Sequence, residues 1–133
     1  MNKINSHNAT NALETRRRQL LRKDLSEVLL WMDEMECINQ EINALSSIEK
    51  QLIKKMSMTL NIQGLRRKNT LLMSAFCKYE QSILNEIEYG KQDYDIKRSN
   101  EHEKQREMYK ELVGQFRALK KEIYLTLLKF KIK

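Results

Sequence analysis

The sequence contains no proline and only three glycines, Gly64, Gly90 and Gly114, in 133 residues. Proline interrupts a helix because it lacks a backbone N–H and clashes with the preceding turn. Its absence, together with many good helix formers such as Glu, Lys, Gln, Leu and Arg, allows long unbroken helices. Aromatic residues make up 7% and charged residues 32%, a balance typical of extended helical pairs rather than a thick globular core. The composition therefore predicts an all-α fold.

Cysteine and long apolar runs are also scarce. Cys37 and Cys77 lie too far apart to form a close metal-binding pair, and two cysteines make no disulfide framework of a small secreted domain. We expect both thiols to be buried or half-buried and inert. No stretch approaches the roughly 18 apolar residues that span a bilayer, and residues 1–11 lack the apolar segment of a signal peptide. We therefore expect a cytoplasmic or nuclear protein without a transmembrane segment.

Residues able to carry chemistry do not form a recognisable catalytic or metal site. The many carboxylates, such as Asp33 and Glu34, are expected on solvated helix faces. His102 lies in a wholly polar stretch, residues 97–107, and its helical neighbours Arg98 and Arg106 repel cations. No nucleophile, base and acid recur at a known spacing, and no glycine-rich loop is present to hold a phosphate. We therefore predict that the chain is not an enzyme and has no catalytic residue, cofactor or metal.

Apolar residues recur at alternating steps of three and four, the heptad pattern of helices that coil around each other. We predict that these heptad seams bind partner helices. The seam residues are Leu25, Val28, Met32, Met35, Asn39, Ile42, Leu72, Phe76, Tyr79, Ile83, Leu112, Phe116, Leu119 and Ile123. Asn39 either fixes the register from a buried position or is turned outward by a shift in the heptad pattern near it. Trp31 either packs in the core or anchors a partner helix.

The helix signals divide the chain into a tail and one extended region. Residues 1–10 are rich in Asn and Ser and are expected to be disordered. Asn11 and Glu14 have the spacing of a capping box, which predicts a helix start. We expect residues 11–131 to form a single helical region, with a turn near residues 59–65 where Asn61 and Gly64 lie. Residues 97–107 are either a helix or a loop, and their helix formers favour the helix. The predicted architecture is a coiled-coil hairpin of two long helices or an extended helical bundle.

The formal net charge of +7 favours acidic partners such as a filament surface, nucleic acid or anionic lipid. The basic clusters expected to contact an acidic surface are Arg16, Arg17, Arg18, Arg66, Arg67 and Lys68. Solvated charge is the equally weighted alternative for each cluster. The aromatic residues occupy the seams instead of forming stacking platforms, which disfavours binding of single-stranded nucleic acid. The basic and apolar segment 119–133 is also typical of helices that bind membrane surfaces, although its seam continues from upstream and favours helix pairing.

In its length, helical content and basic ends, the chain resembles the small coiled-coil subunits of multi-subunit cytoskeletal complexes, in particular an augmin-like spindle complex that binds microtubules. The resemblance is one of kind and covers roughly residues 11–131 without a diagnostic motif. It implies a non-catalytic subunit that pairs with other coiled-coil chains in a hetero-oligomer and contacts tubulin. The alternatives are a subunit of a vesicle- or lysosome-positioning complex, and a basic helical protein that binds nucleic acid or chromatin.

Overall fold

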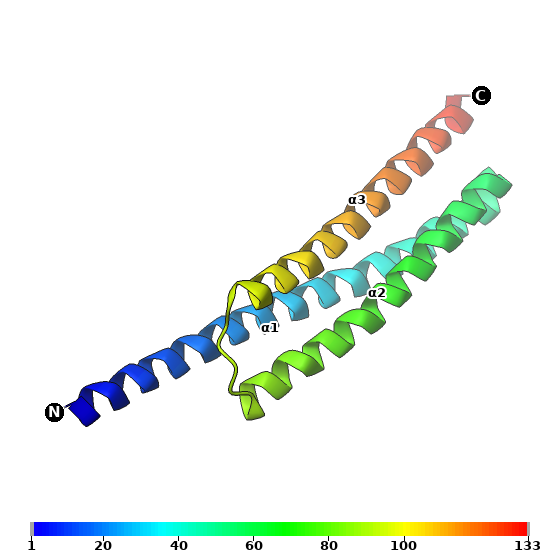
Figure 1. Cartoon of the computed structure of the whole chain (residues 1–133). Coiled ribbons are helices and arrows are strands. Elements are labelled where there is room, and N and C mark those ends of the chain that lie inside the picture. Colours follow the sequence, from blue (N-terminus) through cyan, green and yellow to red (C-terminus); the bar gives the residue numbers. More distant parts are fainter. Residues whose placement is uncertain (1, 133) are drawn as a thin grey trace.

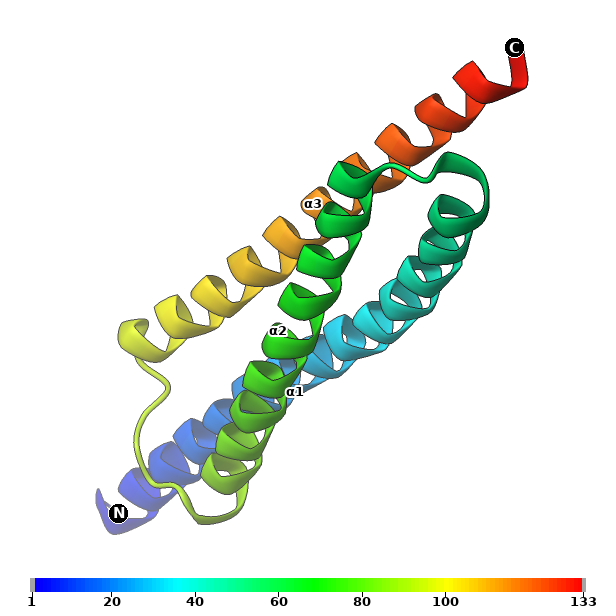
Figure 2. The same cartoon turned by 90° about the vertical axis from the view of Figure 1, so that its right-hand side faces the viewer.

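The computed structural model describes the backbone of residues 2–132 and the side chains of residues 10–130. Helix α1 spans Asn2–Ile48 and continues into a short π-helix, η1, at Glu49–Ile53; α2 spans Met56–Tyr89 and α3 spans Ile96–Ile132. Figures 1 and 2 show an elongated bundle in which α2 runs back along α1 and α3 reverses direction again. The predicted all-α helical bundle is confirmed. The prediction of two long helices is wrong, because a third helix folds back on the first two.

The first turn lies at Lys54 and Lys55, and not at residues 59–65. Lys54 has the left-handed conformation (φ 55°, ψ 47°), and its N–H donates to the carbonyl oxygen of Glu49 at 2.7 Å. Lys55 is extended and precedes α2. Asn61 and Gly64, the predicted turn residues, lie inside α2. This early turn places Met58 and Ile62 in the core, so apolar burial outweighs the cost of about 1–3 kcal/mol for a left-handed non-glycine residue.

The second reversal occurs at the loop between Tyr89 and Ile96. The predicted helical region had its only turn near residues 59–65, so this loop was not predicted. Gly90 ends α2, and its N–H donates to the carbonyl oxygen of Glu86 at 3.1 Å. Asp95 caps the start of α3, because its side chain accepts a hydrogen bond from the N–H of Arg98 at 2.9 Å. An aspartate in this position satisfies one of the free N–H groups of the first helical turn. Residues 97–107 are consequently helical, as the sequence favoured.

Helix α1 begins at Asn2 instead of Asn11, so the backbone is helical over most of the predicted disordered tail. No proline or glycine occurs in residues 2–10 to stop a helix. Asn11 is an interior position rather than a cap: its carbonyl oxygen accepts a hydrogen bond from Thr15 Oγ1 at 2.9 Å. The side chains of residues 1–9 lie outside the described part of the chain.

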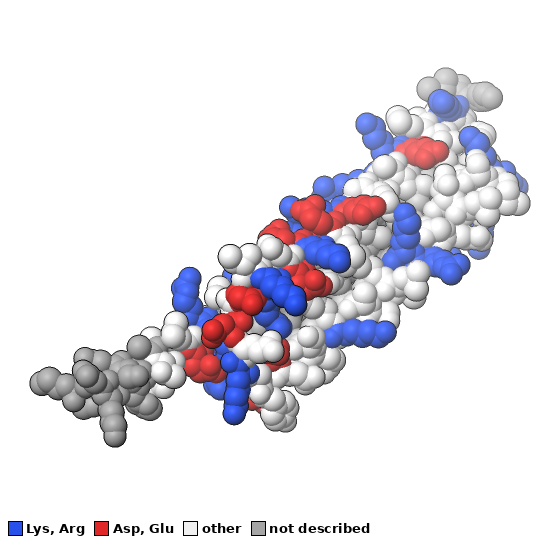
Figure 3. All heavy atoms as spheres, viewed as in Figure 1, with Lys and Arg blue, Asp and Glu red and all other residues white. Residues whose placement is uncertain are grey.

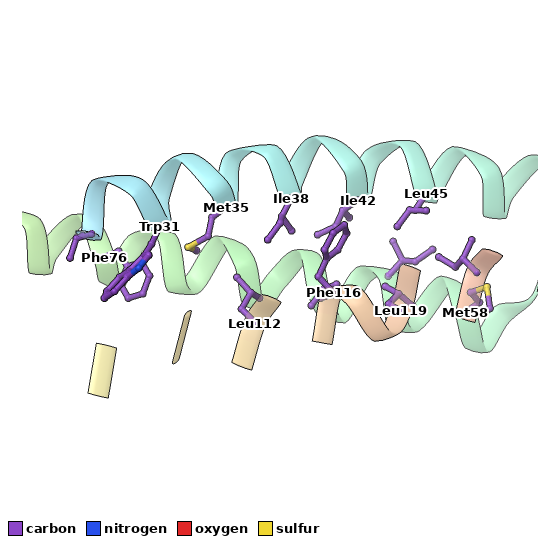
Figure 4. Close-up of a cluster of buried hydrophobic side chains, with 14 of the residues drawn as sticks. Trp31, Met35, Ile38, Ile42, Leu45, Met58, Phe76, Leu112, Phe116 and Leu119 are labelled. Atoms are coloured by element: carbon purple, nitrogen blue, oxygen red, sulfur yellow. The ribbon is translucent and has the colours of Figure 1, made fainter. Parts of the chain in front are cut away.

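The core is a row of apolar side chains that runs along the bundle axis. Figure 4 shows the labelled side chains of α1 pointing to one side of their helix, toward those of α2 and α3. Phe76, Ile83 and Ile123 are fully buried, and each comes from a different turn of α2 or α3. The labelled core residues are Trp31, Met35, Ile38, Ile42, Leu45, Met58, Phe76, Leu112, Phe116 and Leu119. The core therefore joins all three helices of one chain.

Candidate functional site

The heptad seams form the interior of this chain. Nine of the fourteen seam residues are buried, four are half-buried and only Asn39 is exposed. The buried members pack in one apolar cluster with residues from the other helices of the same chain. Three helices in one chain can bury each other's apolar stripes without a partner chain. A partner that binds the folded bundle must therefore contact other residues.

The exposure of Asn39 and of Trp31 decides between the two alternatives that the sequence left open for each of them. Asn39 is exposed, so the shift in heptad pattern turns it outward. Asn69 of α2, which the sequence did not single out, is buried, and its Nδ2 donates to the carbonyl oxygen of Met35 at 3.2 Å. A buried amide with one specific partner favours a single pairing register. Trp31 packs in the core, with its ring centroid 5.6 Å from that of Phe76.

Only one residue of the basic run at positions 16–18 is buried. Arg17 is 5% exposed, and its guanidinium donates to the carbonyl oxygens of Glu86 at 3.2 Å and Gly90 at 2.8 Å. It also pairs with Glu14 at 3.0 Å. Cations are favoured at a helix C-terminus, where carbonyl groups lack helical partners. Arg17 therefore ties α1 to the end of α2 and is not free to contact an acidic partner.

The remaining predicted basic contacts lie at or near the surface. Arg16 and Arg18 are exposed, and Arg18 Nε donates to Glu14 at 3.0 Å. Arg67 and Lys68 are exposed, whereas Arg66 is half-buried and donates to Asn43 Oδ1 at 3.0 Å. Lys68 Nζ reaches α3, where it donates to Gln115 Oε1 at 3.1 Å.

Lysines and arginines gather around the end of the bundle that holds the first turn. Residues 50–70 carry six bases and no acid, and residues 113–130 carry four bases and one acid, Glu122. On the face shown in Figure 3, most acidic side chains lie over the middle of the bundle, away from this end. We call this region the basic end. Its potential favours a negatively charged binding partner.

A groove of about 390 Å³ lies between α2 and α3 at the basic end. Its lining includes two small residues, Gly64 and Ala118, where no side chain fills the space between the helices. A Cβ added to Gly64 would meet no heavy atom within 4 Å. The lining consists of Leu60, Asn61, Gly64, Leu65, Lys68, Gln115, Ala118, Leu119 and Glu122. The bundle is therefore open on this side.

Exposed apolar side chains border this groove. Leu60 is 58% exposed and is part of the lining. Leu125 follows Glu122 by three residues and Leu71 follows Lys68 by three, so helical periodicity places both on the groove side; both are more than half exposed. These exposed leucines make the groove the candidate surface for binding another molecule. We call Leu60, Gly64, Leu71, Ala118 and Leu125 the groove patch.

A second cluster, polar and buried, lies nearer the other end of the bundle. His102 of α3 is 3% exposed, and its Nε2 lies 3.4 Å from both Asp24 Oδ1 and Glu27 Oε2 of α1. Its other ring nitrogen, Nδ1, lies 2.7 Å from the hydroxyl of Tyr79. The Tyr94 hydroxyl donates to Asp24 Oδ2. We call these five residues the His102 cluster.

Charged and aromatic groups surround this cluster. The Arg106 guanidinium binds both Glu27 and Glu103. Trp31 stacks on the imidazole of His102, with centroids 5.2 Å apart and planes inclined by 21°. Apolar rings exclude water and strengthen electrostatic interactions beside them.

The two carboxylates of the His102 cluster differ in their electrostatic balance. Burial raises the pKa of Asp24, although the Tyr94 hydrogen bond and the charge of His102 act in the opposite direction. Burial also acts to raise the pKa of Glu27, but the hydrogen bond and charge of Arg106 outweigh it and leave this pKa lowered. Burial and the nearby Asp24 charge raise the pKa of the Tyr79 and Tyr94 phenols, so both stay protonated. Glu27 thus pairs with the guanidinium of Arg106, whereas the nearest basic group to Asp24 in the cluster is the imidazole of His102.

Sequence reasoning missed this cluster because its members are far apart in the chain. Residues 97–107 are wholly polar, a pattern typical of a solvated segment, yet His102 is buried there and Arg106 is only partly exposed. One signal was present: Asp24 interrupts the apolar row between Leu21 and Val28, at a position that faces the core. A charged residue on the buried face of a helix needs a polar partner from another helix.

The cysteines do not behave as the sequence predicted. Cys37 and Cys77 are both exposed, and both are free thiols. The prediction of buried or half-buried thiols is wrong because both residues lie outside the apolar stripe of their helix. Cys37 directly precedes the buried Ile38, and Cys77 directly follows the buried Phe76. Neighbouring positions on a helix point in directions about 100° apart.

Comparisons with protein-family models, curated proteins and solved structures found no match to this chain. None of the helices, over the described residues, carries an apolar stretch long enough to cross a lipid bilayer. The class that the fold defines is therefore an elongated three-helix bundle with a basic end, an open groove and a buried polar cluster.

Proposed function

We propose that the chain is a non-catalytic structural subunit whose α2–α3 groove receives one helix of a partner coiled-coil protein. The observation that carries the proposal is the groove itself, lined by Gly64 and Ala118 and bordered by exposed leucines. A side chain from a partner helix fits between small residues as a knob fits a hole in a coiled coil. The seams supply the internal core, and the groove patch supplies the intermolecular contact.

Charge around the groove selects the chemistry of this partner helix. Lys68 lines the groove, and Lys129 lies on its side of α3, seven residues after Glu122. Glu122 is the single acid in this part of α3. An amphipathic helix with a narrow apolar stripe and acidic flanks complements this surface. The apolar stripe supplies the affinity, and the charges steer encounter and orientation.

The groove can be blocked without loss of stability. Gly64→Leu places a large side chain in the space that a partner would occupy, and it replaces a helical glycine with a better helix former. Thr70→Leu is the matched control, since Thr70 is also an exposed position of α2 and lies two residues after Lys68, on another face of the helix and outside the groove lining. Both variants are expected to be at least as stable as the wild type in thermal melts.

The decisive measurement is capture of partner proteins from native cells, washed at about 0.5 M salt, which screens surface charge but spares packed apolar contacts. We expect wild type and Thr70→Leu to retain the same coiled-coil chains in constant ratio, and Gly64→Leu to lose them. Equal capture by both variants, or recovery of the bait alone, would refute the groove as the partner site. Loss of bound nucleic acid in the wash would instead identify an electrostatic binder.

The cytoskeletal setting, an augmin-like complex on microtubules, is part of this proposal and is supported by the resemblance of kind and the basic end. Tubulin offers an acidic surface, so the exposed Arg67 and Lys121 are expected to contact it. Co-sedimentation of the purified complex with microtubules tests this, and binding should weaken steeply as salt increases. A complex that never co-sediments, even at low salt, would remove the cytoskeletal setting while leaving the partner groove intact.

A further inference from the structure

We propose that the His102 cluster is a binding site for one divalent transition-metal ion of the zinc type. The proposed ligands are His102 Nε2, Asp24 Oδ1 and Glu27 Oε2, and the three residues each bring one ligand atom to within 4.8 Å of the other two. Two of the three separations are 3.4 Å. Metal–ligand bonds of about 2.0–2.2 Å in tetrahedral geometry place ligand atoms roughly 3.3–3.5 Å apart. Two of the three ligand pairs therefore already have the spacing that such an ion requires, and the two carboxylate oxygens would have to lie equally close to each other once the ion is bound.

The two carboxylates of the cluster favour a cation between them and His102 Nε2. Two carboxylate oxygens face the same ring nitrogen, and oxygens and a bare nitrogen lone pair repel one another. Arg106 balances Glu27, but within the part of the chain whose side chains are described, no lysine or arginine bonds to the buried Asp24. Isolated buried carboxylates are strongly disfavoured. Either a proton on His102 or a metal ion held by Nε2 meets this demand, and the metal ion engages all three groups at once.

The surrounding groups match the outer shell of a metal site. Metal-bound histidines commonly hydrogen-bond through their second nitrogen, which fixes the tautomer and the ring orientation. The Tyr79 hydroxyl is in that position at 2.7 Å from Nδ1. Tyr94 holds the second oxygen of Asp24 and leaves Oδ1 directed at His102. A pocket of about 320 Å³, whose lining includes Arg98 and Glu101, reaches the cluster at Tyr79.

Arg106 competes with the metal ion for Glu27. Its guanidinium binds Glu27 Oε2, the oxygen that would also coordinate the ion. It also binds Glu103, so it keeps a carboxylate partner when the ion takes that oxygen. The ion would thereby cross-link α1 to α3 and stabilise the third helix on the hairpin. Removal of Arg106 should consequently tighten metal binding, which a purely structural ion pair would not do.

The test uses chelator-treated full-length protein in a Cys37→Ser/Cys77→Ser background, because exposed thiols bind zinc themselves. Co²⁺ and Zn²⁺ are titrated separately, with Co²⁺ absorption bands and calorimetry as readouts. We expect one ion per chain and a higher melting temperature with metal. His102→Asn and Asp24→Asn should abolish binding, and Tyr94→Phe should weaken it by about 10–100-fold. Arg106→Gln should bind the ion several-fold more tightly.

The control is His7→Asn, which removes the only other imidazole of the chain and should leave binding unchanged. Circular dichroism identifies any variant that does not fold, in which case Tyr94→Phe and Arg106→Gln decide the result. Absence of Co²⁺ bands in wild type, or unchanged binding in a folded His102→Asn, would overturn the proposal. The groove would be unaffected by either outcome, because it lies at the other end of the bundle.

Discussion

Arg17 provides the sharpest test of the structure, because it stands between two arginines of identical chemistry. We predict that Arg17→Met destabilises the bundle and that Arg16→Met and Arg18→Met do not. Methionine keeps the apolar stem of the side chain but removes its hydrogen-bond donors. Arg17 is buried and donates to two carbonyl oxygens at the end of α2, Glu86 and Gly90. Arg16 and Arg18 are exposed.

The expected magnitude follows from these two bonds. A hydrogen bond from a charged donor contributes about 1.5–3 kcal/mol, and water can replace part of it at a helix end, so we expect a loss of about 2–4 kcal/mol for Arg17→Met. Exposed substitutions without such contacts stay within about 0.5 kcal/mol. The assay is urea denaturation followed by circular dichroism, with the midpoint compared at constant slope. If Arg17→Met and Arg16→Met unfold at the same midpoint, the buried contact between α1 and α2 is refuted.

Three further predictions concern the core, the first turn and pH. Phe76→Ala should lower the free energy of unfolding by about 3–5 kcal/mol because Phe76 is fully buried. Calorimetry should show that Leu71→Ala, at an exposed site, is nearly as stable as the wild type. Equal losses for the two variants would contradict the burial of Phe76 in the core. Lys54→Gly should stabilise the protein by about 0.5–1 kcal/mol, since Lys54 has positive φ, whereas Lys55→Gly should not. If urea titrations show that Lys54→Gly is less stable than the wild type, the left-handed turn at Lys54 is refuted. The raised pKa of Asp24 stabilises the folded state below the ordinary pKa of an aspartate, and this contribution is lost as pH rises through the raised value. In chelator, Asp24→Asn should therefore gain stability relative to wild type as pH rises above the ordinary pKa of an aspartate. A stability difference that stays constant as pH rises would argue against a buried carboxylate.

The sequence predicted the local structure well wherever neighbouring residues determine it. The absence of proline and the apolar spacing of residues such as Val28, Met35, Phe76 and Ile123 indicated long helices with buried stripes, and these residues are buried. A helix and its apolar stripe depend on residues three and four positions apart, which the sequence displays directly. The positions of the turns were less accessible, because Lys54 carries no turn signal and Asn61 and Gly64 carry misleading ones.

The groove and the His102 cluster depended on which helices meet. The sequence could not assign different roles to Arg16, Arg17 and Arg18, or to Asn39 and Asn69, because their partners belong to other helices. The polar neighbours of His102 in the sequence are typical of a solvated segment, but in the fold α3 packs against α1 and brings His102 to Asp24 and Glu27. Apolar burial is non-directional and can be inferred from periodicity alone, whereas a buried polar group requires a particular partner at hydrogen-bond distance. The sequence by itself thus determined the helices and their buried faces, and only the tertiary structure decided the polar contacts and the open groove.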